Sequence, residues 1–406
     1  MEEWKTYKIG SLCSISSSKR IFAKEYQSSG IPFYRGKEVI EKQKGETVST
    51  ELYISKSRYD EIKNKFGVPE EGDMLLTSVG TLGIPYVVKN ETFYFKDGNL
   101  TWFSNFKGIN SKFLYYWFLS PMAKNAIDAK AIGSTQKALT IDALSKFEID
   151  IPNIETQEKI VSILSSLDSK IELNRRINDN LEQQAQALFK SWFVDFEPFR
   201  GGEFVDSELG LIPKGWRVVS LGEVTKQITE KVGNREDVTV LSPINSGELV
   251  LSEEYFTKQV FSKDLSKYLI VNPLSFAYNP ARINIGSIGL NTFDFVGCVS
   301  PVYVVFECEP NYQYFFDFFK RTAMFKDEVA LRAIGGVRQS LGYNDLSLIK
   351  TIYPTSDVVV EFNNLYLKMK EVMIKNTDQN EKFISLRDSL LPKLMSGELK
   401  INEFNC

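Results

Sequence analysis

The sequence has 406 residues, of which 43% are hydrophobic and 13% aromatic, enough to bury cores in two or three domains. It contains no histidine, which excludes Ser-His and Cys-His nucleophile pairs and histidine-ligated metal sites. Its four cysteines lie far apart, which argues against a zinc ribbon or a disulfide framework. The formal net charge is −3, without the overall basic excess that is usual for nucleic-acid-binding proteins.

The sequence shows no targeting or membrane pattern. Its first residues lack the basic and then apolar order of a signal peptide, and no apolar run approaches the roughly 20 residues of a membrane helix. We therefore expect a soluble, cytoplasmic protein.

The first region, residues 1–152, mixes two kinds of pattern. Segments such as IPFYRGKEVI, DMLLTSVG, IPYVVKN and TFYFKDG are rich in β-branched and aromatic residues and are interrupted by Gly, Pro and Asn, which predicts short strands and turns. KFLYYWFLSPMAKNAI instead has the spacing of an amphipathic helix. The region is predicted to form an α+β globular domain.

Residues 153–197 are predicted to contain one long helix with a heptad pattern. Its apolar positions step by four and three residues from Thr156 to about Phe193, with two asparagines in the middle. The predicted seam consists of Ile160, Leu164, Leu167, Ile171, Asn174, Asn178, Leu181 and Leu188, with Ala185 and Trp192. The segment 155–197 carries five basic and eight acidic residues, so this surface suits a protein partner better than DNA.

The second half of the chain repeats the first. After a Gly- and Pro-containing linker at 198–213, a second α+β domain is predicted at 214–354 and a second long helix within 355–406. AIGSTQKALTIDAL at 131–144 matches AIGGVRQSLGYNDL at 333–346 with an offset of 202 residues, whereas the domain beginnings match with an offset of 212. The two halves agree at their edges and diverge between them, which suits two modules that do one job on two different targets.

The second helix carries the same seam. Adding 202 to the first seam gives Phe362, Tyr366, Met369, Met373, Asn376, Asn380, Phe383 and Leu390, with Arg387 as the one position that breaks the apolar pattern. A buried seam asparagine needs a polar partner and so sets the register. Parallel and antiparallel pairing both match asparagines. We favour an antiparallel intramolecular coiled coil that separates the two domains, because each helix starts directly behind its own domain.

Four stretches resemble type I restriction–modification specificity subunits. They are residues 151–199 (IPNIETQEKIV…FEPF), 383–399 (FISLRDSLLPKLMSGEL), 133–139 (GSTQKAL) and 207–216 (SELGLIPKGW). The resemblance covers the whole length and the order of the parts. It implies two target-recognition domains, each reading one half of a bipartite double-stranded DNA target, and conserved helices that bind two modification (methyltransferase) subunits.

The resemblance also implies a subunit without catalysis of its own. Restriction subunits complete the complex, and S-adenosylmethionine, ATP and magnesium belong to the partner subunits. We therefore expect no catalytic residue, no metal ligand and no cofactor in this chain. Asn279-Pro280, the short glycine pairs and the Glu-x-Lys triplets lack the context of a methyltransferase, dinucleotide or nuclease motif.

Residues that contact DNA bases are expected to be Arg, Lys, Asn or Gln on exposed loops or helix starts. The candidates in the first domain are Lys19, Arg20, Arg35, Lys37, Arg58, Ser134, Thr135, Gln136 and Lys137. Those in the second domain are Arg282, Asn284, Arg332, Arg338 and Gln339. The loops at 133–137 and 335–339 rank highest because they occupy equivalent places in both halves. The alternative function is a coiled-coil scaffold whose two domains bind proteins.

Overall fold

The structure is a computed structural model that describes residues 4–46, 48–131, 137–256, 258, 260–332 and 340–399. The chain forms two compact units. The first comprises Met1–Arg176 and Lys375–Cys406, and the second comprises Ile177–Ile374. Each unit contains one globular α+β domain and about half of each of two long helices, α7 (Ile154–Phe193) and α13 (Ser356–Met395). The predicted fold class is confirmed.

The first domain contains short strands and helices in alternation. Its helices are α1 (Ile9–Leu12), α2 (Gly36–Lys44), α3 (Lys56–Phe66), α4 (Ser111–Leu119), α5 (Pro121–Lys130) and α6 (Ile141–Ser145), with the 3-10 helix η1 (Ala23–Glu25). Its strands are β1 (Lys5–Lys8), β2 (Ser14–Ser16), β3 (Ile31–Tyr34), β4 (Tyr53–Ile54), β5 (Met74–Thr77), β6 (Pro85–Val87), β7 (Tyr94–Phe95), β8 (Leu100–Ser104) and β9 (Glu148–Ile151).

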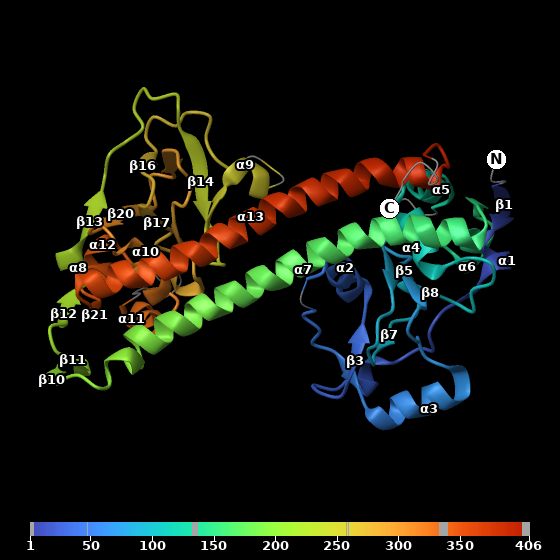
Figure 1. The fold of residues 1–406 in the computed structure, drawn as a ribbon, viewed down its shortest axis with the longest axis horizontal. Helices are drawn as coiled ribbons and strands as arrows, with labels where there is room; N and C mark the ends of the chain where they lie inside the picture. Colours follow the sequence, from blue (N-terminus) through green and yellow to red (C-terminus); the bar gives the residue numbers. More distant parts are fainter. Residues whose placement is uncertain are drawn as a thin grey trace. The chain divides into compact units, whose positions relative to one another are not determined.

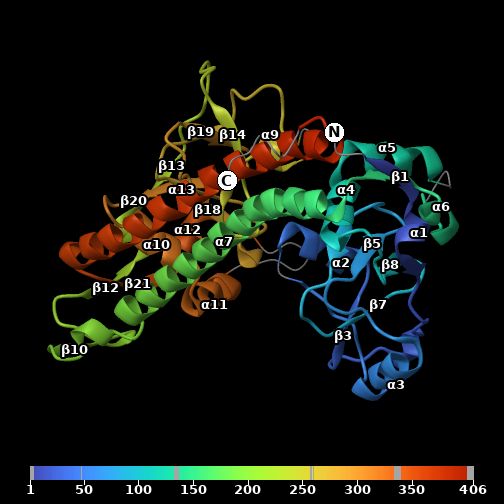
Figure 2. The same ribbon diagram turned by 45° about the vertical axis from the view of Figure 1, so that its right-hand side comes forward.

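These strands form three small sheets. The largest has the order β2-β8-β5-β6, a second has the order β4-β3-β7, and β1 pairs with β9. Helix α4 lies beside β5 and β8 in both views (Figures 1 and 2), and the rings of Phe118 and Phe103 meet edge to face at 5.7 Å. All four residues of β5, Met74–Thr77, are buried, so this strand lies in the core of the domain.

The second domain has the same plan. Its helices are α8 (Leu221–Val224), α9 (Ser252–Tyr255), α10 (Gln313–Phe319), α11 (Ala323–Arg332) and α12 (Tyr343–Leu346), with the 3-10 helix η3 (Ile283–Ile285). Its strands are β12 (Arg217–Ser220), β13 (Thr225–Ile228), β14 (Thr239–Pro243), β15 (Leu249–Leu251), β16 (Leu269–Val271), β17 (Phe276–Tyr278), β18 (Ile288–Leu290), β19 (Gly297–Val299), β20 (Val304–Cys308) and β21 (Lys350–Tyr353). The sheets have the orders β13-β20-β17-β18 and β15-β14-β19-β16, and β12 pairs with β21.

The strand pair that closes each domain demonstrates the internal repeat. Lys5 of β1 lies opposite Ile151 of β9, and Arg217 of β12 lies opposite Tyr353 of β21. The first strands are 212 residues apart and the last strands 202 residues apart, as the two sequence offsets predict. Helices α4 and α10, and α5 and α11, also begin 202 residues apart. The predicted pseudo-two-fold repeat is confirmed.

A glycine at the start of each domain explains part of the repeated sequence. A Cβ atom on Gly10 would lie 2.8 Å from Cβ of Ser145, and one on Gly222 would lie 3.0 Å from Cβ of Ser347. Real Cβ atoms essentially never lie as close as 2.8 Å, and 3.0 Å is tighter than most real Cβ contacts. Glycine therefore allows the close contact between α1 and α6 and favours the one between α8 and α12.

The long helices pair in opposite directions within each unit. In the first unit, Nδ2 of Asn174 donates to Oδ1 of Asn380 at 3.0 Å, and the earlier residue Asp168 pairs with the later residue Arg387 at 2.9 Å. In the second unit, Nδ2 of Asn178 donates to the carbonyl oxygen of Met373 at 3.0 Å. Increasing numbers on α7 meet decreasing numbers on α13, so the antiparallel direction is confirmed.

All predicted seam positions are buried or half-buried, but the buried face is wider than the heptad stripe. Toward the end of α7, Phe189 and Phe193 are more deeply buried than the predicted Leu188. At the equivalent end of α13, Leu391 and Met395 are buried while Leu390 is half-buried. These ends pack on a globular domain as well as on the other helix, and such packing requires a broader apolar face.

Other segments differ from the sequence-based expectation. The segment 31–40, expected as strand and turn, continues after β3 into helix α2, which ends at Gly45 with φ +73°. The expected linker at 198–213 contains the 3-10 helix η2 (Glu197–Phe199 at its edge) and a hairpin of β10 (Phe204–Ser207) and β11 (Gly210–Pro213). Across the described residues, neither long helix nor any other is apolar enough over its length to cross a membrane.

Candidate nucleic-acid interface

In the first domain, the loop between β5 and β6 holds a backbone turn beside Lys137, the one described residue of the predicted loop 133–137. Ser78 accepts a backbone hydrogen bond from Leu139 at 2.9 Å, and the N–H of Gly80 donates to the carbonyl oxygen of Lys137 at 3.2 Å. Both Gly80 and Gly83 have positive φ, which favours glycine, and an added Cβ on Gly83 would meet Cδ1 of Ile127. The glycines of GTLG therefore serve loop geometry.

In the second domain, the loop between β17 and β18 has a similar place. The side chain of Asn279 accepts from the N–H of Ala281 at 3.0 Å, which closes an Asx turn before η3. Ile283 is buried and anchors the loop, whereas the neighbouring Arg282 and Asn284 are exposed. Gly286, with φ +95°, ends the turn before β18.

The two loops are equivalent in position and different in chemistry. The N–H of Leu341 donates to the carbonyl oxygen of Pro280 at 3.1 Å, and both residues lie 202 positions after Leu139 and Ser78. The first loop presents small residues of the sequence SVGTLG, and the second presents the longer NPARINIGS. The two domains thus anchor their loops in the same way but expose different side chains on them.

Two of the predicted residues of the first domain lie beside its loop. Lys137 is exposed next to Gly80, with Asp128 3.9 Å away. Arg35 immediately precedes Gly36, whose added Cβ would lie 3.9 Å from Cγ2 of Thr77 at the end of β5. The structure therefore brings Lys137 and Arg35 to the same strand end.

Arg35 is held by a buried carboxylate. Glu38 is fully buried and accepts from Nη2 of Arg35 at 2.7 Å and from the backbone N–H of Arg35 at 2.7 Å. Burial works to raise the pKa of Glu38, but the hydrogen bonds from Arg35 outweigh it and hold this pKa below its usual value. The hydrogen bond to Glu38 in turn raises the pKa of Arg35, so both groups remain charged.

The other four candidates of the first domain that the structure describes make contacts elsewhere. Nζ of Lys19 lies 4.5 Å from the centre of the ring of Phe66, the last residue of α3, and Arg20 pairs with Asp97 at 2.8 Å. Arg58 pairs with Glu25 at 2.9 Å and with Glu61 at 2.7 Å. Lys37 is exposed on the first turn of α2 and lies 3.6 Å from Glu41. Because Arg58 pairs with two carboxylates, we assign it a mainly structural role.

In the second domain, the structure distinguishes Arg282 from Arg332. Arg332 pairs with Glu328 one helical turn earlier at 2.9 Å. Arg282 forms no ion pair with any residue that the structure describes, and its side chain is exposed on the loop. Ser134, Thr135, Gln136, Arg338 and Gln339 lie outside the described residues, so their placement stays a prediction.

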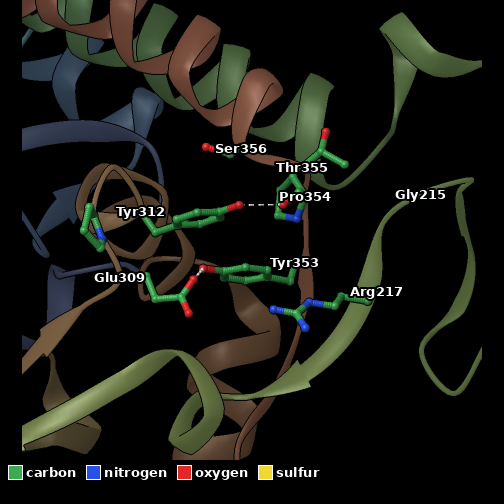
Figure 3. Close-up of a pocket in the computed structure, with 9 residues that line it drawn as sticks. Gly215, Arg217, Glu309, Tyr312, Tyr353, Pro354, Thr355 and Ser356 are labelled. Carbon is green, nitrogen blue, oxygen red and sulfur yellow. Dashed lines mark hydrogen bonds between the residues drawn. The ribbon is translucent and has the colours of Figure 1, made fainter.

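A pocket of about 540 Å³ lies in the second unit at the start of α13 (Figure 3). The rings of Tyr312 and Tyr353 are stacked at 4.1 Å, and the Tyr353 hydroxyl donates to Glu309 at 2.5 Å. Burial and this hydrogen bond raise the pKa of Tyr353. Arg217 lies over the other side of the Tyr353 ring, 5.3 Å from its centre. No residue of the β17–β18 loop lines the pocket, so we do not assign it to that loop.

Three buried charged residues were missed by the sequence analysis. Glu38, Asp317 and Lys320 are buried, although their residue types are usually exposed. The one available signal was the spacing of Glu38 three residues after Arg35, which fits a capping position. Among the described residues, no group of three or more Cys, Asp or Glu side chains is placed to hold a metal ion.

The chain is similar to known proteins over its full length. A family model described as "Type I restriction modification DNA specificity domain" matches residues 1–183. The type I restriction enzyme MjaIX specificity subunit of Methanocaldococcus jannaschii is 26% identical over 99% of this chain and 95% of that protein. The type I restriction enzyme HindI specificity subunit of Haemophilus influenzae is 26% identical over 67% of this chain and 73% of that protein.

A solved structure shares the fold. The crystal structure of the type I restriction–modification system S subunit from M. genitalium matches with a TM-score of 0.57 at 16% identity, covering 97% of this chain and 96% of that one. The internal repeat, the paired long helices and these relatives agree with one another. The chain is similar to type I restriction enzyme specificity subunits in sequence over 99% of its length and shares its fold with one of them.

Proposed function

We propose that this chain is the DNA-reading subunit of a type I restriction–modification enzyme and that each domain reads one half of a bipartite double-stranded target. The observation that carries the proposal is the pair of equivalent loops after β5 and β17. Their anchoring hydrogen bonds, Leu139 to Ser78 and Leu341 to Pro280, repeat at an offset of 202, while their exposed residues differ. Two modules with one frame and different loops suit the reading of two different sequences.

The exposed groups of the second loop have the chemistry that base reading needs. An arginine can donate two hydrogen bonds to guanine in the major groove, and an asparagine can pair with adenine in the same way. Arg282 and Asn284 supply these two types on one short segment. In the first domain, Lys137 and Arg35 supply cationic groups at the end of β5.

We infer that the chain itself is not catalytic. Its sequence lacks histidine, and the similarity to type I specificity subunits supports a reading role. Two modification subunits would bind the long helices, restriction subunits would complete the complex, and S-adenosylmethionine, ATP and magnesium would belong to those partners. The acidic balance of residues 155–197 supports a protein partner at α7.

Methylation mapping of the assembled enzyme tests the proposal. The chain, produced with its modification subunits, should direct methylation to one split sequence in a genome. Arg282→Ala should lower discrimination at one base of a single half-target by about tenfold or more. Arg235→Ala, which removes an exposed arginine elsewhere in the second domain, serves as the matched control and should leave the target unchanged.

Two outcomes would reject the proposal. If the wild-type complex methylates no split sequence and binds no duplex DNA at any salt concentration, a scaffold whose domains bind proteins becomes the better explanation. If Arg282→Ala weakens binding equally at all sequences, Arg282 contacts only phosphates, and the β17–β18 loop does not read bases.

A further inference from the structure

Lys320 is a buried cation whose donors are all used. It follows the last residue of α10, and its side chain is 2% exposed. Its Nζ atom donates to the carbonyl oxygen of Gly247 at 2.6 Å, to that of Ile288 at 3.0 Å, and to Oδ1 of Asp317 at 2.7 Å. A lysine ammonium has three N–H donors, so these three acceptors satisfy it completely.

The fold does not itself require a cation at this place. The equivalent residue of the first domain, 202 positions earlier, is Phe118, which is buried against Phe103 in an apolar core. Burial lowers the pKa of Lys320 because it disfavours the charged form, and Asp317 opposes this effect. A buried charge is costly where an apolar side chain would suffice, so its contacts identify what the second domain gains from it.

The two carbonyl groups bound by Lys320 belong to two neighbouring loops. Gly247 lies in the turn between β14 and β15, and Ile288 is the first residue of β18, directly after the loop that carries Arg282. The same two segments meet again where Oγ of Ser287 donates to the carbonyl oxygen of Pro243 at 2.8 Å. We define these contacts of Lys320 and Ser287 as the loop clamp.

Close backbone packing leaves the clamped loop little room to shift. An added Cβ on Gly286 would lie 2.6 Å from the carbonyl oxygen of Asn245, and one on Gly289 would lie 2.4 Å from the backbone nitrogen of Leu249. The β17–β18 loop therefore lies directly on the β14–β15 turn. Lys320 is the side chain that joins both to helix α10.

The clamp continues to the long helix within the same unit. Oδ2 of Asp317 pairs with Nη2 of Arg321 at 2.7 Å, and Arg321 also pairs with Glu182 of α7. Alternating charges thus connect α7 with the two carbonyl groups. The loop is oriented by the helix layer as well as by its own sheet.

We propose that Lys320 is a positioning residue for base reading by the second domain. It holds the β17–β18 loop on the β14–β15 turn and thereby sets the place of Arg282 and Asn284. This inference rests on the proposed function, since it assigns the reading of one half-target to this loop. The first domain, with Phe118 at the equivalent place, does not use such a cation.

Lys320→Met in the complex with the modification subunits tests the inference. Methionine keeps much of the volume but donates no hydrogen bond. We expect discrimination at the second half-target to fall about tenfold or more, while discrimination at the first half-target stays unchanged. Lys326→Met makes the same chemical change at an exposed site on α11 and should alter neither half-target.

Hydrogen exchange separates a moved loop from an unfolded domain. In Lys320→Met, the amides of Gly247, Ser287 and Ile288 should exchange faster, while the amides of β17 and β20 stay protected. Where β17 and β20 also lose protection, Ser287→Ala replaces Lys320→Met as the test, because it removes one hydrogen bond of the same clamp. We expect Ser287→Ala to lower discrimination at the second half-target about threefold.

The outcomes are distinct. Unchanged discrimination at the second half-target in a folded Lys320→Met complex overturns the inference, as does unchanged discrimination in Ser287→Ala if Lys320→Met unfolds. Equal losses at both half-targets also overturn it. A wild-type complex without any split target instead overturns the proposed function, and the exchange rates then report on the loop alone.

Discussion

The two units share their frame and differ in the polar groups inside it. Gly10 and Gly222 pack on equivalent serines, and the closing strands pair in equivalent registers. Under the start of α7, however, the fully buried Gln157 binds three backbone groups, whereas Val359 occupies the equivalent place under α13. The two units therefore share the close packing at these glycines, but different side chains form the hydrogen bonds to their buried backbone groups.

Different side chains bind the equivalent proline carbonyl groups of the two units. Nε2 of Gln157 donates to the carbonyl oxygen of Pro152 at 3.0 Å, and the Tyr312 hydroxyl donates to that of Pro354 at 2.8 Å. Tyr312 stands 202 positions after Asn110, whose backbone N–H binds Gln157 in the first unit. A tyrosine from the helix layer thus replaces a glutamine from the long helix.

The largest expected effect comes from copying the second unit's residue into the first. Gln157→Val leaves the N–H of Asn110 and the carbonyl groups of Gly108 and Pro152 without their side-chain partner. Unpaired buried polar groups are costly, so we expect a loss of about 3 kcal/mol in the free energy of unfolding, measured with urea. Adding Asn110→Tyr should recover little of this loss, because the new bond to Pro152 is offset by the loss of the cap that the Asn110 side chain provides to the N–H of Lys112 at the start of α4.

Val359→Ala provides the matched control at the equivalent position. It removes apolar contacts only and should cost about 1–2 kcal/mol, with no recovery from any change at Tyr312. If Gln157→Val is as stable as the wild type, Gln157 does not satisfy the backbone of the first unit, and the contrast between the units disappears.

A smaller effect is expected at the seam asparagines. Asn380→Leu leaves the amide of Asn174 without its 3.0 Å acceptor and should cost about 1 kcal/mol. The double variant with Asn174→Leu should regain this loss, because two facing leucines are apolar partners. A double-mutant cycle of unfolding free energies measures the coupling.

The second unit supplies the comparison for this cycle. Asn178 donates to the backbone of Met373, so we expect Asn178→Leu combined with Met373→Leu to show little coupling. Equal coupling in both cycles would mean that side-chain pairing at Asn174 and Asn380 has no special role in the register.

The smallest effect concerns pH and only the first unit. The pKa of Glu38 is lower in the folded chain than its usual value of 4.5. Its contribution to stability is therefore fully present above pH 4.5 and is lost as the pH falls through the lower folded-state value. The difference in melting temperature between wild type and Glu38→Gln should be larger at pH 7 than at pH 3. A constant difference would contradict the assigned pKa direction.

The sequence was sufficient for the features that repeat. The offsets of 202 and 212, the heptads and the asparagines predicted the two domains and the two paired helices, because each signal occurs twice and is local in the chain. The antiparallel direction came from the chain order, in which each helix starts directly behind its own domain. The role of Arg387, which breaks the apolar seam, could not be predicted from local sequence, because its partner Asp168 lies 219 residues away.

Features that depend on tertiary contacts could not be predicted in this way. Lys320 lies in a segment with other charged residues, where a lysine is usually exposed, and only the loops around Gly247 and Ile288 explain its burial. Likewise, Arg282 and Arg332 look alike in sequence, and they differ because only Arg332 has an acidic residue one turn away on its helix.

The segments of chain that make up each unit determine the order in which the units can be completed during synthesis. The second unit is one continuous stretch of chain, Ile177–Ile374, whereas the first needs residues from both ends. Leu391, Leu394 and Met395 belong to the same buried cluster as Ile160 and Leu164, and Gly397 packs against the ring of Trp4. The ribosome makes the first domain before the second unit but makes residues 391–397 only after it, so the first domain cannot be completed until the whole second unit has been synthesised.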